Sequence, residues 1–182
     1  SHRQGHQDPG VQAPGPSVGL AQWLWEAYLR THDSVIRAEY LIRTRDRHGI
    51  RILPQLVVLG AETSLGDPKL GGPIVTEAYN LGCIKWRPRT AENAVYHDLS
   101  VGTFERRGVL WFRFPTADAG MEAWGRFIVT EGYRDALNGE RWELFAGRYY
   151  GETVAGYAAY LNNLQLLAAK FADRAALAGW AI

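Results

Sequence analysis

The stretch from Leu56 to Gly66 constrains the fold most strongly, because an uninterrupted apolar run ends there in one carboxylate and a glycine-containing loop. An apolar run of this length is either a buried strand or a buried helix. Pro54 favours the helix, since proline lacks a backbone N–H and is tolerated in the first helical turn. The sequence therefore predicts a short central helix from Leu53 to about Glu62 or Thr63.

Glu62 lies at the predicted end of this helix, between the core and the surface. Desolvation at such a position raises the pKa of a carboxyl group toward that of a useful general acid. A solvated helix terminus explains a lone glutamate equally simply. Glu62 therefore needs a second residue before it indicates chemistry.

Length and composition limit the number of domains and the covalent links that the fold can contain. The chain has 182 residues, of which 47% are hydrophobic, and this suits one buried domain better than two. We interpret residues 1–16, rich in Gly, Pro, Gln and His, as a tag remnant or flexible linker, and residues 17–182 as a single domain. Cys83 is the one cysteine, so the fold has no intramolecular disulfide.

Charge and hydropathy exclude some classes of partner. The formal net charge of +1 does not call for a nucleic acid, and no segment approaches the roughly 20 apolar residues of a membrane span. The basic residues are nevertheless uneven, with six Lys or Arg against three acids between Lys85 and Arg113. This excess suits either an anionic polymer or an ordinary solvated face.

Apolar positions at helical spacing predict further helices around the central one. These cover Ser17–Arg30 with Ser17 as cap, Val35–Arg47 stopped by Gly49, Thr116–Thr130, Glu140–Ala146 and Thr153–Phe171. The pattern changes to short strand-like pieces at Val95-Tyr96, Val101–Phe104 and Val109–Phe114, with a hairpin turn at Arg106-Arg107-Gly108. We therefore predict an α+β fold, mostly α, with a small β-lobe at about 94–114.

Most kinds of catalytic site lack their usual pattern in this chain. The histidines have no metal-ligand spacing, Ser64 lacks a Gly-x-Ser-x-Gly context, and Gly71-Gly72-Pro73 is not part of a phosphate-binding loop. We expect no metal and no organic cofactor. Carboxylate chemistry remains, with Glu62 and Glu105 as candidates. Two carboxylates that flank a glycosidic bond can cleave it, and Trp and Tyr faces suit sugar rings, although most of the aromatics, including Trp111 and Trp124, are expected in the core.

Short motifs in a fixed order add a resemblance to a known family. They are Glu62-Thr63-Ser64-Leu65-Gly66, Tyr79-Asn80-Leu81-Gly82-Cys83-Ile84-Lys85, Thr103-Phe104-Glu105, Trp111-Phe112-Arg113-Phe114, Ala146-Gly147-Arg148-Tyr149-Tyr150-Gly151-Glu152 and Tyr157-Ala158-Ala159-Tyr160-Leu161. Their order resembles glycoside hydrolase family 73, the peptidoglycan β-N-acetylglucosaminidases. That family has Glu-Ser-x-x-Gly, Asn-Leu-Phe-Gly-Ile-Lys, Thr-x-Glu, Phe-Arg-x-Tyr, Ala-Gly-x-Tyr-Ala-Thr-Asp and Tyr-Ala-x-Lys-Leu.

The resemblance implies a lysozyme-like helical body, a β-hairpin lobe and a cleft between them. Glu62 corresponds to the acid that protonates the glycosidic oxygen. Glu105 corresponds to the second carboxylate, which acts on water or on the substrate's 2-acetamido group. Tyr149, or its neighbour Tyr150, corresponds to the tyrosine that lines the cleft.

At other positions the resemblance leaves the role of the residue open. Asn80, Lys85 and Trp86 are expected either to contact sugar or to support the loop beside the site. Gly82-Cys83 stands where the family has Phe-Gly, so the aromatic residue beneath the cleft is either missing or supplied by Trp86.

The expected function is hydrolysis of the β-1,4 bond between N-acetylglucosamine and N-acetylmuramic acid in peptidoglycan glycan strands. The alternatives are a muramidase, a lytic transglycosylase, which needs no second carboxylate, and a non-catalytic wall-binding or assembly module. Each of these places the protein outside the cell, in the envelope or on a virion, where a larger envelope or phage-tail assembly is a further expected partner.

Overall fold

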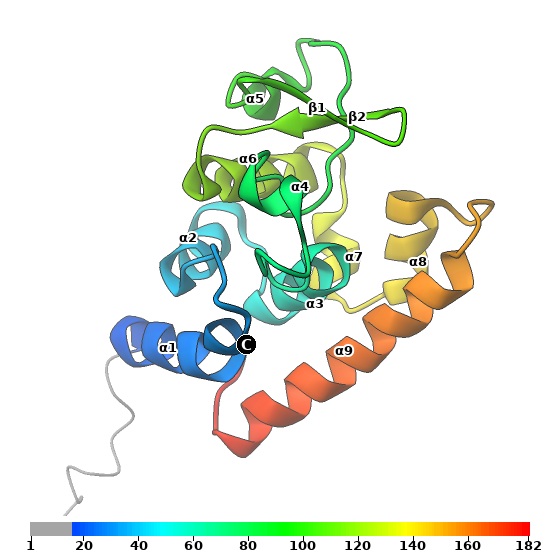
Figure 1. Cartoon of the computed structure of the whole chain (residues 1–182). Coiled ribbons are helices and arrows are strands. Elements are labelled where there is room, and N and C mark those ends of the chain that lie inside the picture. Colours follow the sequence, from blue (N-terminus) through cyan, green and yellow to red (C-terminus); the bar gives the residue numbers. More distant parts are fainter. Residues whose placement is uncertain (1–15) are drawn as a thin grey trace, which may run out of the picture.

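The computed structural model describes residues 16–182 as a mostly helical molecule with one antiparallel two-stranded sheet (Figure 1). In chain order the elements are α1 Pro16–Leu24, η1 Trp25–Leu29, η2 Arg30–His32, α2 Ala38–His48, α3 Ile52–Thr63, α4 Pro73–Thr76, α5 Ala94–His97, β1 Gly102–Arg106, β2 Val109–Arg113, α6 Ala117–Thr130, α7 Arg134–Asn138, α8 Trp142–Ala146, η3 Gly147–Gly151 and α9 Tyr157–Leu177. The predicted α+β class, mostly α, is confirmed. The predicted linker falls almost wholly on residues 1–15, outside the described residues.

The helix α3 forms the centre of the fold, and it covers the predicted central helix with one added residue at its start. Every residue from Ile52 to Leu59 is buried, so this helix is covered on all sides. Gln55, the polar residue of the run, donates from its amide to the carbonyls of Leu41 and Ile50 at 3.0 and 2.9 Å. These bonds pair the donor group of Gln55, while its side-chain oxygen is buried without a partner.

The long helix α9 lies against α3 in Figure 1. The two helices approach closely at Gly60, where an added Cβ would lie 3.3 Å from Leu167 and 3.4 Å from Phe171. The segment after α9 returns to the start of α3, where Leu53 N–H donates to the carbonyl of Ile182 at 3.1 Å. The last part of the described chain therefore covers both the side and the beginning of the central helix.

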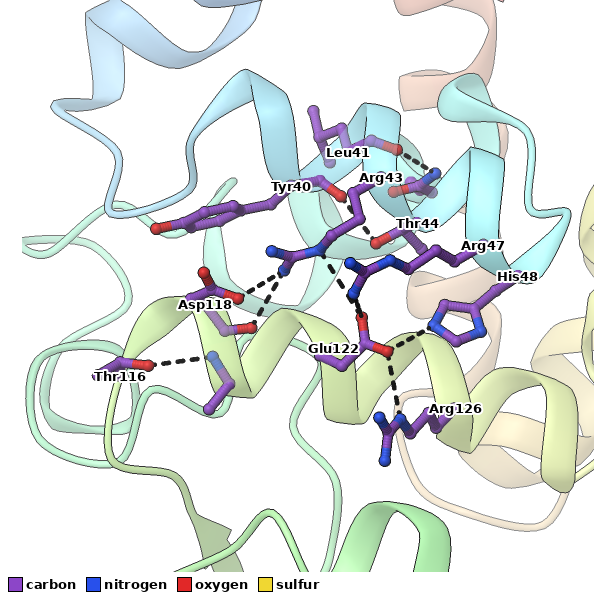
Figure 2. Close-up of polar contacts among 12 residues, drawn as sticks. Tyr40, Leu41, Arg43, Thr44, Arg47, His48, Thr116, Asp118, Glu122 and Arg126 are labelled. Atoms are coloured by element: carbon purple, nitrogen blue, oxygen red, sulfur yellow. Dashed lines mark hydrogen bonds and ion pairs between the residues drawn. The ribbon is translucent and has the colours of Figure 1, made fainter.

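A buried carboxylate joins α2 to α6 (Figure 2). Glu122, on α6, is only 9% exposed. Its oxygens lie 3.0 Å from His48 Nε2, 3.2 Å from Arg126 Nε and 3.7 Å from both Arg43 Nε and Arg47 Nη1. Burial opposes the charge on Glu122, but His48 and Arg126 outweigh it and lower the pKa below the ordinary 4.5. An ionised Glu122 therefore holds the two helices together.

The predicted hairpin is confirmed as β1 and β2. The two-residue turn at Arg107 and Gly108 has positive φ angles at both positions, 52° and 77°, as a tight hairpin turn requires. In the register, Phe104 lies opposite Trp111 and Glu105 opposite Leu110. Lys85 forms an additional antiparallel bridge with Trp111, so the segment before the hairpin extends the sheet on the β2 side.

Some predicted elements differ from the structure. Val95-Tyr96 was expected in a strand, but it lies in α5, because Tyr96 is buried and its hydroxyl donates to Glu131 at 2.8 Å. Glu140 has a φ of 53° and precedes α8, which begins at Trp142. The start of α9 is Tyr157, so the exposed Val154 is outside the helix.

Two further differences concern the start of α1 and the helix α7. Pro16 begins α1, so Ser17 is within the helix and is not its cap. The short helix α7 was not predicted. The start predicted at Thr116, by contrast, is confirmed: Thr116 caps α6, since its hydroxyl accepts from Ala119 N–H at 3.1 Å. No helix within residues 16–182 has the length and hydropathy to cross a bilayer.

Glu122→Gln is expected to lower the free energy of unfolding at pH 7 by about 2 kcal/mol, because it leaves several cations without their shared counter-charge. The contribution of Glu122 is present above pH 4.5 and is lost as the pH falls through its lowered folded pKa. Urea denaturation from pH 3 to pH 8 measures both effects. Asp118→Asn is the control, since Asp118 is exposed and removing its contact with Arg43 costs under about 1 kcal/mol. Equal losses in the two variants would contradict the role of Glu122.

Candidate functional site

A pocket of about 400 Å³ lies where the end of α3 meets the segment before the hairpin, β2, the end of α6, and η3. Figure 1 shows the hairpin on one side of this region and η3 with α8 on another. The lining consists of Glu62, Cys83, Ile84, Lys85, Arg87, Val109, Trp111, Phe127, Tyr133, Arg148, Tyr149, Tyr150 and Val154. It is aromatic and basic, and Glu62 is its only carboxylic acid.

The backbone turns sharply directly after Glu62. Ser64, Leu65 and Gly66 all have positive φ angles, from 52° to 66°, and this ends the helix at Thr63. Gly66 has no room for a side chain, because a Cβ there would lie 2.9 Å from Ile36. Thr63 also donates from its hydroxyl to the carbonyl of Leu81 at 2.9 Å. The last turn of α3 is thereby anchored, and Glu62 is held at the pocket.

Burial of its carboxyl group raises the pKa of Glu62 from 4.5 to about 7, although the residue as a whole is only half-buried. The largest opposing contribution is a hydrogen bond from the hydroxyl of Tyr160 to Glu62 Oε1 at 2.7 Å. A carboxyl group with a pKa near 7 is protonated in a large fraction of molecules at neutral pH. It can therefore donate a proton and, once ionised, accept one back.

Tyr160 on α9 was not predicted as a site residue. Its ring stacks on Tyr150, with centroids 4.5 Å apart and planes 16° apart. Tyr150 is itself anchored through its hydroxyl, which donates to the carbonyl of Ala155 at 2.9 Å. The one available signal was the place of Tyr160 in the Tyr157–Leu161 motif, where the family has lysine. Nothing in that motif indicates a contact with Glu62.

Cys83 and Tyr149 form the inner wall of the pocket beside Glu62. The Cys83 thiol lies 3.7 Å from the backbone carbonyl of Glu62, and burial raises its pKa well above the ordinary value. Tyr149 stacks on Phe145 at 4.7 Å, and its hydroxyl donates to the carbonyl of Gly82. Burial likewise raises the pKa of Tyr149, so both groups remain neutral near pH 7.

Glu105 lies on the other face of the hairpin. Side chains that pair across two strands share a face, and neighbours along a strand alternate between faces. Val109 and Trp111 line the pocket, whereas Glu105 pairs with Leu110, which lies between them. Glu105 is exposed and is not part of the pocket lining. The structure therefore does not bring Glu105 together with Glu62.

The remaining predicted site residues separate into two groups. Lys85, Tyr149 and Tyr150 line the pocket with Glu62. Asn80 is fully buried; its amide donates to the carbonyls of Ile84 and Phe112, and its oxygen accepts from Ile84 N–H. Asn80 thus supports the loop, which was one of its two predicted roles. Trp86 is half-buried near His97 and outside the pocket lining.

The ring of Trp124 occupies the space beside Gly82 that a side chain at position 82 would need. Trp124 is fully buried on α6, and a Cβ at position 82 would lie 2.1 Å from its ring. The predicted core position of Trp124 is therefore confirmed. The aromatic residue beneath the cleft was expected either to be missing or to be supplied by Trp86. Trp111, also predicted for the core, is half-buried and lines the pocket.

Comparison with known proteins finds no relative: no family model, no curated protein and no solved structure matches the chain. Within residues 16–182, no cluster of three or more His, Cys, Asp or Glu side chains has the arrangement of a metal site.

Glu62→Gln is expected to stabilise the protein at pH 8. A carboxyl group whose folded pKa is raised favours the folded state below pH 4.5, and this advantage is lost as the pH rises through about 7. Between pH 4.5 and about 7, the free energy of unfolding of the wild type should fall by on the order of 3 kcal/mol relative to that of the variant. The glutamine of the variant keeps an oxygen that accepts a hydrogen bond from Tyr160. Parallel denaturation curves at pH 5 and pH 8 measure the difference. An identical pH dependence in both proteins would contradict the raised pKa.

Tyr160→Phe is expected to raise the pKa of Glu62 further, because it removes a hydrogen bond that stabilises the carboxylate. Carbon-13 NMR titration of the Glu62 carboxyl carbon measures this shift. Tyr150→Phe is the matched control, since it removes the neighbouring hydroxyl and keeps the stacked ring. The proposal of a direct Tyr160–Glu62 bond fails if both variants titrate like the wild type.

Proposed function

We propose that this protein cleaves the glycan strands of peptidoglycan, with Glu62 as the acid that protonates the glycosidic oxygen. The observation that carries the proposal is a single buried carboxyl group with a pKa of about 7, set in an aromatic pocket of about 400 Å³. An acid of this strength suits proton transfer at neutral pH, and the aromatic lining suits sugar rings. The resemblance to glycoside hydrolase family 73 supports the choice of peptidoglycan as the substrate.

The position of Glu105 favours one of the predicted reactions over the others. Hydrolysis with two carboxylates needs both of them beside the scissile bond. Glu105 lies on the far face of the hairpin, and the pocket contains no other acid than Glu62. A lytic transglycosylase needs no second carboxylate, because the nucleophile is the 6-hydroxyl group of the muramic acid itself. The geometry therefore supports transglycosylation more than glucosaminidase hydrolysis.

In the proposed reaction the bond between the anomeric carbon of muramic acid and O4 of the next glucosamine breaks. Glu62 gives its proton to O4, and the 6-hydroxyl oxygen bonds to the anomeric carbon. The hydroxyl proton passes to the Glu62 carboxylate, so the acid is restored and no water is consumed. Tyr160 holds Glu62 in place throughout, and its hydrogen bond is strongest while Glu62 is ionised.

Product analysis on purified cell walls tests this proposal. The wild type should release muropeptides with 1,6-anhydromuramic ends, which borohydride does not reduce. Glu62→Gln should lower release at least about 100-fold, as expected for loss of a general acid, while Glu105→Gln should retain activity. Mass spectrometry before and after reduction distinguishes the products.

Each other outcome identifies a different function. Reducible glucosamine ends, with activity lost in Glu105→Gln, would establish the two-carboxylate glucosaminidase that the motif order predicts. Reducible muramic acid ends would establish a muramidase. Binding of walls without any release would overturn catalysis in favour of a wall-binding module.

A further inference from the structure

The pocket around Glu62 is positively charged when its acid is protonated. Lys85, Arg87 and Arg148 line it, and no acid other than Glu62 does. Below about pH 7 most Glu62 carboxyl groups carry no charge to offset these cations. A pocket lined by one sign of charge raises the local concentration of oppositely charged ligands.

Two of these cations are already engaged by the protein. Arg87 lies 3.8 Å from a carboxylate oxygen of Glu131. Arg148 donates to the carbonyls of Gly132 and Glu131, each at 3.3 Å, and its guanidinium lies 5.3 Å from the ring centroid of Tyr133. Both side chains are thereby oriented by the segment after α6.

Lys85 differs from the two arginines. No carboxylate within residues 16–182 lies at ion-pair distance from it, and its ammonium stands 5.9 Å from the ring centroid of Trp111. The backbone beneath it is nevertheless fixed on both sides. Trp86 N–H donates to the carbonyl of Leu110 at 2.9 Å, and Phe112 N–H donates to that of Ile84 at 3.1 Å. Lys85 therefore presents an exposed charge from a rigid position in the lining of the pocket.

We infer that the pocket selects a glycan that carries carboxylates over a neutral one, and that Lys85 binds the carboxylate. The inference rests on the proposed function and deepens it, since it concerns the charge of the substrate. An uncharged N-acetylglucosamine polymer has the same β-1,4 linkage and acetamido groups but offers nothing to Lys85. In peptidoglycan the carboxylate belongs either to the peptide stem or, where the stem has been removed, to the lactyl group of muramic acid.

Calorimetric binding to the Glu62→Gln protein tests the inference without requiring cleavage. Three ligands of matched length are compared: chitin oligosaccharides, glycan strands freed of peptides by an amidase, and strands with intact stems. At least one carboxylated ligand should bind several-fold more tightly than chitin, and this advantage should shrink as salt rises from 50 to 200 mM. Preference for the peptide-free strands identifies the lactyl carboxylate, and preference for the intact strands identifies the stem.

Second-site variants in the same background test Lys85 itself. Lys85→Gln should weaken carboxylated ligands roughly fivefold and leave chitin unchanged, and Lys85→Arg should restore most of the loss. Lys69→Gln is the charge-matched control, because Lys69 is exposed on the loop before α4 and outside the pocket. Equal affinity for charged and neutral ligands would overturn the inference. So would a Lys85→Gln loss that is the same for both, since Lys85 would then act through Trp111 and not through its charge.

Glycosidic cleavage in the wild type is measured separately. A protein that cleaves peptidoglycan and chitin equally well would refute the selectivity and leave the role of Glu62 intact. A protein that binds carboxylated strands through Lys85 without cleaving them would refute the reaction and leave the selectivity intact.

Discussion

The burial of α3 on every side is the constraint on which the rest of the structure depends. A helix whose residues from Ile52 to Leu59 are all buried needs neighbours around its whole circumference. The surrounding helices supply this cover, with α9 along one side and the chain end at its first turn. Only the last turn approaches a pocket, and Glu62 is placed there. Its raised pKa therefore follows from the same burial that stabilises the fold.

The sequence predicted those elements that are determined by short-range features of their own residues. The apolar run with Pro54 predicted α3, the break at Pro115-Thr116 predicted the start of α6, and the turn at Arg106-Arg107-Gly108 predicted the hairpin. The strand predicted at Val95-Tyr96 was wrong, because its strand propensity is weaker than the tertiary contacts of Tyr96. That side chain is buried and donates a hydrogen bond to Glu131. Propensity over two residues cannot compete with such a contact.

The site was predictable only in part, for a geometric reason. Glu62 was predicted as a candidate because a helix end and a motif both pointed to it. The face of Glu105, however, depends on strand register, and one residue of register exchanges the two faces. Tyr160 lies 98 positions after Glu62, and no spacing rule connects them. The charge excess from Lys85 to Arg113 was visible in the sequence, but only the structure separates Lys85 at the pocket from cations such as Arg89, which pairs with Asp98.

The hydrogen bond from Tyr160 also couples two properties that are usually considered separately. It joins the ionisation of Glu62 to the docking of α9, because the donor belongs to that helix. Thermodynamic linkage makes such a relation reciprocal. If a ligand or substitution loosens the start of α9, Glu62 becomes a weaker acid, and loss of the proton from Glu62 in turn tightens the helix. The acid strength of this pocket thus depends on how α3 and α9, two helices far apart in the sequence, pack together, and not on the glutamate alone.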